Sequence, residues 1–105
     1  MTTGKSFPWV EAGEGVRRRI LAENPEAMTV QVEFSKGSVG DPHHHPHVQT
    51  IFVAAGRFEF TVDGEVKQYA AGDSLVIPSN VVHGCVALED GTLIDSFVPR
   101  RDDFL

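Results

Sequence analysis

Short runs of alternating apolar and polar residues, each closed by turn residues, constrain the fold of this chain more than any other feature. In residues 28–34, Met28, Val30, Val32 and Phe34 alternate with polar side chains, which predicts a strand with one apolar face. Similar runs recur along the chain, and the strands predicted from them are 28–34, 51–55, 57–62, 66–69, 74–77, 85–88 and 93–98. Breaks about every eight to twelve residues are typical of an antiparallel sandwich or barrel.

Turn residues indicate how some of these strands connect. Asp63-Gly64 is typical of a tight hairpin between the two strands that flank it. Strand 85–88 is expected to pair with strand 93–98 across the turn at 89–91.

The segments outside these strands carry weaker signals. Residues 35–40 are expected to form a loop, and the one helix candidate, 17–26, is interrupted by Pro25. The arginine run 17–19 is interpreted as a solvent-exposed strand or turn face. A ligand role for one of these arginines is the less favoured alternative.

Length and composition restrict the organisation and the class of protein. A chain of 105 residues is expected to form one domain, 1–105. Its formal net charge of −6 and pI near 5.2 argue against nucleic acid as a partner. No apolar run reaches the roughly 18 residues of a transmembrane helix, and residues 1–8 lack the apolar core of an export signal. The single cysteine, Cys85, excludes an internal disulfide, so a cytoplasmic location is expected.

The histidines are concentrated in one internal segment. Four of the five lie within residues 41–47, and the fifth is His83. If the segment is extended, His43 and His45 point to the same side, and Gln49 keeps that parity. Imidazole is the commonest ligand for several divalent metals, and a carboxamide oxygen can complete such a site. The cluster alone leaves two interpretations open, a metal site or a polar loop that binds metal adventitiously.

The spacing around these histidines forms a two-part motif. His43-x-His45-x3-Gln49-x6-Gly56 is followed by Gly72-x5-Pro78-x-Asn80-x2-His83. This pattern resembles the cupin superfamily, with motifs at about 37–56 and 72–87. The resemblance implies an all-β, single-domain cupin fold, a double-stranded β-helix or jelly-roll barrel. It also implies that one divalent metal ion is bound by His43, His45, Gln49 and His83.

Two residues depart from the family pattern. Gln49 stands in place of the usual glutamate, and Asn80 stands in place of a glycine, although asparagine tolerates positive φ. A neutral ligand set leaves the charge of the ion uncompensated, so the site is expected to attract an anionic substrate and act mainly as a Lewis acid. The metal is expected to be nickel, zinc, manganese or iron, and redox chemistry stays open. His44 is expected to face solvent or a dimer partner, and His47 to support a ligand.

The predicted last strand and the tail after it hold further candidates. Asp95 and Phe97 share a face with Leu93. Asp95 is either a general acid or base, or a carboxylate that is paired with an arginine or faces water. Phe97 is either core or the floor under a sugar ring. Arg100 or Arg101 either folds back to bind a carboxylate or lies in a solvated turn.

Four stretches extend the resemblance to the KdgF type of small bacterial cupin, which is linked to pectin and alginate breakdown. The stretches are 13–20, 36–40 with the following Pro42-His43, 54–60 and 95–105. The resemblance implies conversion of 4,5-unsaturated uronate monosaccharides into linear ketonised sugar acids. It implies Asp95 as the catalytic group, with Phe97 and Arg101 beside it. The connection between His45 and Gln49 is one residue shorter than in that group.

Two other functions are compatible with the same residues. One is an iron-dependent dioxygenase of the small-cupin kind, and the other is a non-catalytic cupin that binds a sugar or a metal. The expected partners are a small anionic sugar and a second copy of the chain, with N-terminal strand exchange as a reasonable mode of dimerisation. Neither nucleic acid nor a membrane is expected as a partner.

Overall fold

The computed structural model describes residues 7–105, so most of the segment 1–8 used above to argue against export lies outside the described residues. The strands in chain order are β1 (Val10–Glu11), β2 (Val16–Asn24), β3 (Ala27–Phe34), β4 (Val39–His43), β5 (Val48–Ala55), β6 (Arg57–Val62), β7 (Glu65–Ala70), β8 (Ser74–Ile77), β9 (His83–Ala87) and β10 (Gly91–Val98). A short 3₁₀ helix, η1 (Asp102–Phe104), follows the last strand. Over residues 7–105, no helix is long and apolar enough to cross a membrane.

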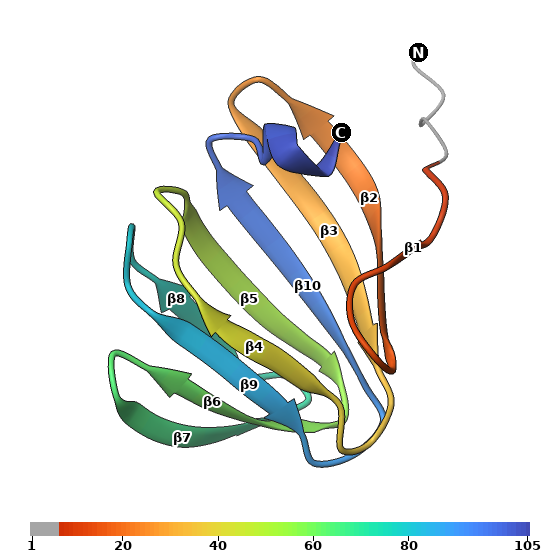
Figure 1. Ribbon diagram of the computed structural model, residues 1–105, viewed down its shortest axis with the longest axis vertical. Helices are drawn as coiled ribbons and strands as arrows, with labels where there is room; N and C mark the ends of the chain where they lie inside the picture. The colour runs from red at the N-terminus through yellow and green to blue at the C-terminus, as the bar shows by residue number, and fades with distance from the viewer. Residues whose placement is uncertain (1–6) are drawn as a thin grey trace.

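The strands form two antiparallel sheets that face each other. One has six strands in the order β1-β2-β3-β10-β5-β8, and the other has four in the order β4-β9-β6-β7. After β3 the chain changes sheet at every connection except the β6–β7 hairpin. The predicted jelly roll is therefore confirmed. The β4–β5 connection, the end of β10 and η1 lie at the same end of the molecule (Figure 1).

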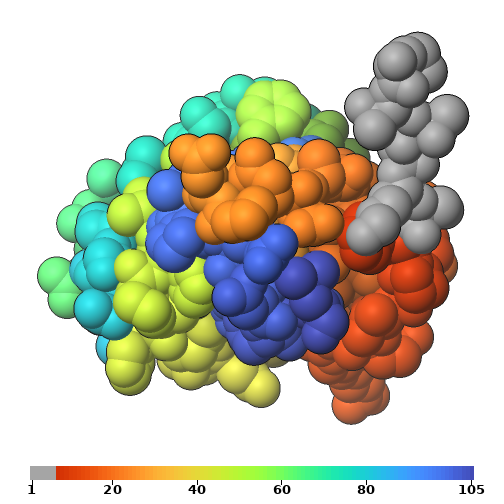
Figure 2. All heavy atoms as spheres, turned by 90° about the horizontal axis from the view of Figure 1, so that it is seen from above, coloured from red at the N-terminus to blue at the C-terminus, as the bar shows by residue number. Residues whose placement is uncertain are grey.

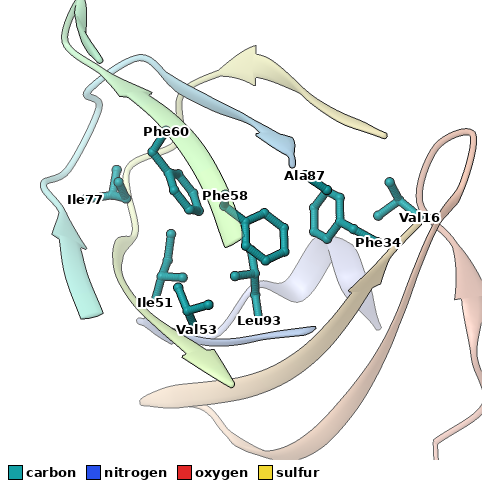
Figure 3. Close-up of a cluster of buried hydrophobic side chains, with 9 residues drawn as sticks. All are labelled: Val16, Phe34, Ile51, Val53, Phe58, Phe60, Ile77, Ala87 and Leu93. Atoms are coloured by element: carbon teal, nitrogen blue, oxygen red, sulfur yellow. The ribbon is translucent and has the colours of Figure 1, made fainter. Parts of the chain in front are cut away.

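Alternation along the strands places the core between the two sheets. In β5, Gln49, Ile51 and Val53 are buried while their neighbours are exposed. The largest buried cluster joins both sheets (Figure 3) and consists of Val16, Phe34, Ile51, Val53, Phe58, Phe60, Ile77, Ala87 and Leu93. The rings of Phe34 and Phe58 meet edge to face with centroids 5.2 Å apart. Contacts of this kind hold the sheets together. The buried polar residues among 7–105 are His45, Gln49, His83 and Asp95.

Every strand range predicted from the sequence overlaps an observed strand. Strand 74–77 and the Asp63-Gly64 hairpin are confirmed. The helix candidate 17–26 is instead mostly strand β2, and the expected loop 35–40 already contains the start of β4. In both segments pairing with a neighbouring strand outweighs a weak local signal.

The expected hairpin between 85–88 and 93–98 is wrong. Strand β9 pairs with β4 and β6, whereas β10 pairs with β3 and β5 in the other sheet. The connection between them packs too closely for a side chain, because a Cβ on Gly91 would lie 2.6 Å from the Phe58 ring. The turn at 89–91 therefore carries the chain from one sheet to the other.

Candidate metal centre and its cavity

Three histidines converge where the β4–β5 connection meets β9. His43 ends β4 and lies opposite His83, the first residue of β9. His45 lies in the connection between β4 and β5, which crosses from one sheet to the other. Its ring approaches those of His43 and His83 from this connection. One ring nitrogen from each residue lies within 4.8 Å of the others. This spacing is suitable for three ligands of one ion.

Backbone carbonyl groups orient all three rings. Nδ1 of His43 donates to the carbonyl of Asp41 at 2.9 Å, and Nδ1 of His83 donates to the carbonyl of Val81 at 2.9 Å. His45 makes the same kind of bond, from Nδ1 to the carbonyl of His47 at 3.0 Å. Because a carbonyl only accepts, Nδ1 carries the proton and Nε2 keeps its lone pair. Such second hydrogen bonds fix the tautomer of histidines that bind metals.

The amide of Gln49 completes the group from the second position of β5. Its Oε1 lies 3.1 Å from Nε2 of His45. Both atoms are acceptors in the tautomer given above, so a cation between them would relieve the contact. In addition, the buried Nε2 of His83 has no hydrogen-bond partner among residues 7–105, although buried polar atoms are normally paired. The donor set of His43, His45, Gln49 and His83 thus fits a divalent metal ion.

The surroundings keep two of these imidazoles neutral. Burial lowers the pKa of His83 to about 4, with smaller contributions from His43 and His45, while its bond to Val81 acts in the opposite direction. Burial also lowers the pKa of His45, against the contact with Gln49. Metal binding requires the neutral form, so these residues need not release a proton near neutral pH.

An extended segment from His43 to Gln49 was assumed when the histidines were assigned to one face. The structure does not contain such a continuous strand. Strand β4 ends at His43, and residues 44–47 cross to the six-stranded sheet. His45 is buried within this crossing, while His44 is exposed as expected. The carbonyl of His45 accepts from the amide N of Asn80 at 2.8 Å, and Asn80 has the positive φ of 62° that its motif position requires.

Asp95 brings a buried carboxyl group beside the amide of Gln49. It lies on the inward face of β10 and is 7% exposed. Burial raises its pKa to about 7, while Gln49 and Arg101 act in the opposite direction. Its Oδ1 has no hydrogen-bond partner within the described part of the chain. The interpretation of Asp95 as a carboxylate that is paired with an arginine or faces water is therefore wrong. Its side chain is buried, and no ion pair to it exists among residues 7–105.

A cavity of about 910 Å³ connects these groups. Its lining includes His43, Gln49, His83, Asp95, Phe97 and Arg101. The ring of Phe97 contacts the ring of His45, with centroids 5.7 Å apart, on one side and the Phe104 ring on the other. The structure therefore brings together all seven residues named as candidate ligands or catalytic groups.

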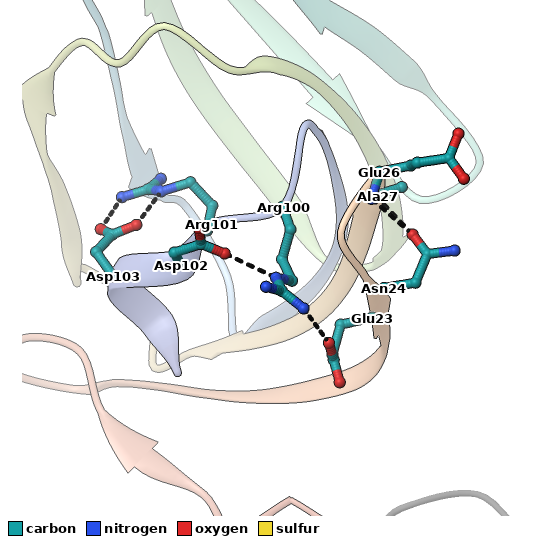
Figure 4. Close-up of polar contacts among 8 residues, drawn as sticks. All are labelled: Glu23, Asn24, Glu26, Ala27, Arg100, Arg101, Asp102 and Asp103. Carbon is teal, nitrogen blue, oxygen red and sulfur yellow. Dashed lines mark hydrogen bonds and ion pairs between the residues drawn. The ribbon is translucent and has the colours of Figure 1, made fainter.

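The two arginines of the tail differ in position. Arg100 points away from the cavity and binds Glu23 and Asp102, as Figure 4 shows. Arg101 lines the cavity, and its guanidinium donates from Nε and Nη2 to the two carboxylate oxygens of Asp103 at 3.0 and 2.8 Å. Viewed from above in Figure 2, the dark blue C-terminal residues lie between the yellow-green and orange segments at this end of the molecule.

Arg18, which was not distinguished from its neighbours in the sequence, also lines the cavity. The arginine run was interpreted as one solvent-exposed face, but only Arg17 is exposed, while Arg18 and Arg19 are half-buried. Arg18 has the inward parity of Val16 and Ile20, two buried residues of β2. That alternation was visible in the sequence and was sufficient to separate Arg18 from its neighbours.

The fold and the arrangement of the histidines define a class of protein. Residues 30–94 match the Cupin domain family, and the chain belongs to it. Among curated proteins, "Pectin degradation protein KdgF" of Dickeya dadantii is 45% identical over 100 residues, which cover 93% of this chain and 91% of that protein. The KdgF resemblance drawn from the sequence is thus confirmed.

Two solved structures are similar over almost the whole chain. KdgF from Halomonas sp. has a TM-score of 0.90 and 43% identity, covering 98% of this chain and 100% of that one. An RmlC-like cupin from Shewanella frigidimarina has a TM-score of 0.91 and 40% identity, covering 99% and 94%.

Proposed function

We propose that this protein is a metal-dependent enzyme that opens and ketonises 4,5-unsaturated uronate monosaccharides derived from pectin or alginate. The observation that carries the proposal is the placement of Asp95, whose Oδ1 has no hydrogen-bond partner among residues 7–105. Asp95 lines the same cavity as His43, His83 and Gln49, and His45 converges with the other two histidines. The relative from Dickeya dadantii, which is named a pectin degradation protein, supports the substrate class. Burying an unpaired carboxyl group costs free energy of folding. Such groups are concentrated at functional sites, where their altered pKa serves the chemistry.

The proposed metal ligands are His43, His45, Gln49 and His83. A bound nickel, zinc, manganese or iron ion would act as a Lewis acid toward oxygens of the sugar. The four ligands are neutral, so this ligand set contains no carboxylate that would repel an anionic substrate or neutralise the charge of the ion. Arg101 is proposed to hold the uronate carboxylate, and Phe97 to support the sugar ring.

Asp95 is proposed to move the proton. The substrate is a cyclic hemiacetal and an enol ether, so Oδ1 of Asp95 accepts the proton of the anomeric hydroxyl as the bond from the anomeric carbon to the ring oxygen breaks. An aldehyde forms, and the ring oxygen leaves as an enolate. Return of the proton to the former alkene carbon gives the ketone. The product is an isomer of the substrate, and no electron donor or acceptor is required.

The alkene absorbance in the ultraviolet tests this proposal directly. The metal-loaded protein should remove this absorbance from a 4,5-unsaturated uronate well above the spontaneous rate. Asp95→Asn should lose about 10²- to 10⁴-fold in rate, the usual contribution of a general acid or base. The variant should still bind metal, because Asp95 is not among the proposed ligands. Chelation should abolish the activity of the parent protein.

An unchanged absorbance with a fully metal-loaded protein would exclude uronate opening. Oxygen consumption with an iron-loaded sample would then separate the dioxygenase from a non-catalytic binding protein. Activity that is unaffected by Asp95→Asn would instead remove the role given to Asp95.

Homodimerisation in the cytoplasm completes the proposal. Phe52, Val76 and Val98 are about half exposed on the outward parity of β5, β8 and β10, so the six-stranded sheet carries apolar side chains on its outer face. Sedimentation equilibrium would determine whether two copies associate. The lone thiol of Cys85 suits a reducing compartment.

A further inference from the structure

Arg18 occupies a position where β2 otherwise has core residues. It lies between Val16 and Ile20 on the inward face, opposite Val32 of β3. Its neighbours point outward, where Arg17 binds Glu33 and Arg19 donates to Gln31. Partial burial of a cation at a core position costs free energy unless an anion or a hydrogen-bond acceptor compensates for the lost water.

No hydrogen bond or ion pair to Arg18 exists within residues 7–105. Its guanidinium contacts the face of the Phe104 ring at 4.0 Å, and the guanidinium of Arg101 lies 4.2 Å from the same ring. Asp103 is bound by Arg101 through two hydrogen bonds. Two cations therefore share one neighbouring carboxylate, and that carboxylate is engaged by Arg101.

The local electrostatics agree with this count of charges. Burial is the main cause that lowers the pKa of Arg18, and the charge of Arg101 lowers it further. The charge of Asp103 acts in the opposite direction. An anion entering the cavity would meet the five N–H donors of Arg18, none of which is used by another described residue. A guanidinium binds a carboxylate through two parallel hydrogen bonds, which an ammonium does not reproduce.

We infer that Arg18 binds the carboxylate of the sugar acid in this cavity, with Arg101 as the second cation beside it. The identity of the sugar acid rests on the proposed function, but the anion site does not. A uronate that places its carboxylate at Arg18 and Arg101 would extend toward Asp95, His43 and His83, which line the same cavity. Arg18 is then a determinant of specificity for acidic over neutral sugars.

Calorimetric titration with galacturonate and with its uncharged methyl ester tests the inference. The experiment uses the full metal-loaded chain and compares it with Arg18→Met, which keeps an apolar stem against Phe104. Galacturonate should bind about 10- to 100-fold more weakly to Arg18→Met, as expected for a lost hydrogen bond to a charged group. Binding of the methyl ester should change little.

Two further variants control the comparison. Arg17→Met removes the same side chain from the outward face of the same strand and should leave both affinities unchanged. Arg18→Lys keeps the charge without the planar fork, so its affinity for galacturonate should be intermediate. It also replaces Arg18→Met if the latter does not fold.

The inference is overturned if the Arg18 variants bind galacturonate as tightly as the parent protein. It is also overturned if the parent protein does not prefer galacturonate to the methyl ester. The absorbance assay on the same samples keeps the two proposals separate. Binding that depends on Arg18 without any turnover would retain the anion site and reject uronate opening.

Discussion

At the level of single residues, His44 and His45 provide a direct test of the metal site. They are adjacent, but His44 is exposed and His45 is 6% exposed, with its Nε2 beside Gln49. We expect His45→Ala to bind much less than one metal ion per chain after dialysis, because one of three imidazole ligands is lost. His44→Ala should keep the stoichiometry of the parent protein. Elemental analysis of the dialysed samples measures both.

The fold should survive His45→Ala. The bond that His45 makes to the amide N of Asn80 comes from its backbone carbonyl, which alanine retains. Circular dichroism of the metal-free samples therefore serves as the control. Equal metal content in the two variants would contradict the proposed ligand set.

Parity along a strand predicted some of the site residues and could have predicted one more. Asp95 and Phe97 were placed on the face of Leu93 by alternation alone, and all three are buried. Arg18 was passed over because three successive arginines suggest a solvated run, although alternate residues of a strand face opposite sides. The hydrogen bonds that orient the histidine rings were beyond sequence reasoning, since they depend on the path of the backbone at residues 41–47.

At the level of secondary-structure elements, two glycines differ in what surrounds them. Gly56, between β5 and β6, has φ 83°, and Gly64, in the β6–β7 hairpin, has φ 79°. A Cβ on Gly56 would lie 2.5 Å from the carbonyl oxygen of Asp90, whereas a Cβ on Gly64 would meet nothing within 4 Å. Gly64→Ala should therefore cost only the left-handed backbone, about 1–2 kcal/mol.

Gly56→Ala should lower the free energy of unfolding more than Gly64→Ala does, because it adds a clash with the backbone of Asp90. Overpacking of this kind adds about 1–3 kcal/mol, because the turn at 89–91 would have to move. Urea unfolding of the two variants gives the difference in free energy. Equal destabilisation would show that the β9–β10 connection is not held against Gly56.

The same connection marks the limit of sequence reasoning about elements. A three-residue turn between apolar runs has the composition of a hairpin, and this composition predicted that 85–88 pairs with 93–98. What separates a hairpin from a change of sheet is the packing of Gly91 against Phe58 and Ala55, residues more than thirty positions earlier. Local hairpins such as Asp63-Gly64 were predictable because their two strands pair with each other.

At the level of the whole molecule, the candidate metal ligands come from both sheets. His43 and His83 belong to the four-stranded sheet, Gln49 belongs to the six-stranded sheet, and His45 lies in the crossing between them. The hydrophobic cluster closes the two sheets elsewhere, while this end contains polar groups around a cavity. A bound ion would therefore act as a cross-link between the sheets in addition to any chemical role.

Removal of the metal should consequently lower the thermal stability of the whole fold. A ligand that binds only the native state at about 100 times its Kd stabilises that state by about 2.7 kcal/mol. For a chain of this size, each kcal/mol corresponds to about 4–8 °C, so chelation should lower Tm by about 10–20 °C. Differential scanning calorimetry with and without chelator measures the shift. His44→Ala should show the same shift and His45→Ala almost none, because only His45 lies among the proposed ligands. A metal-loaded protein whose Tm does not change on chelation would show that the ion does not join the two sheets.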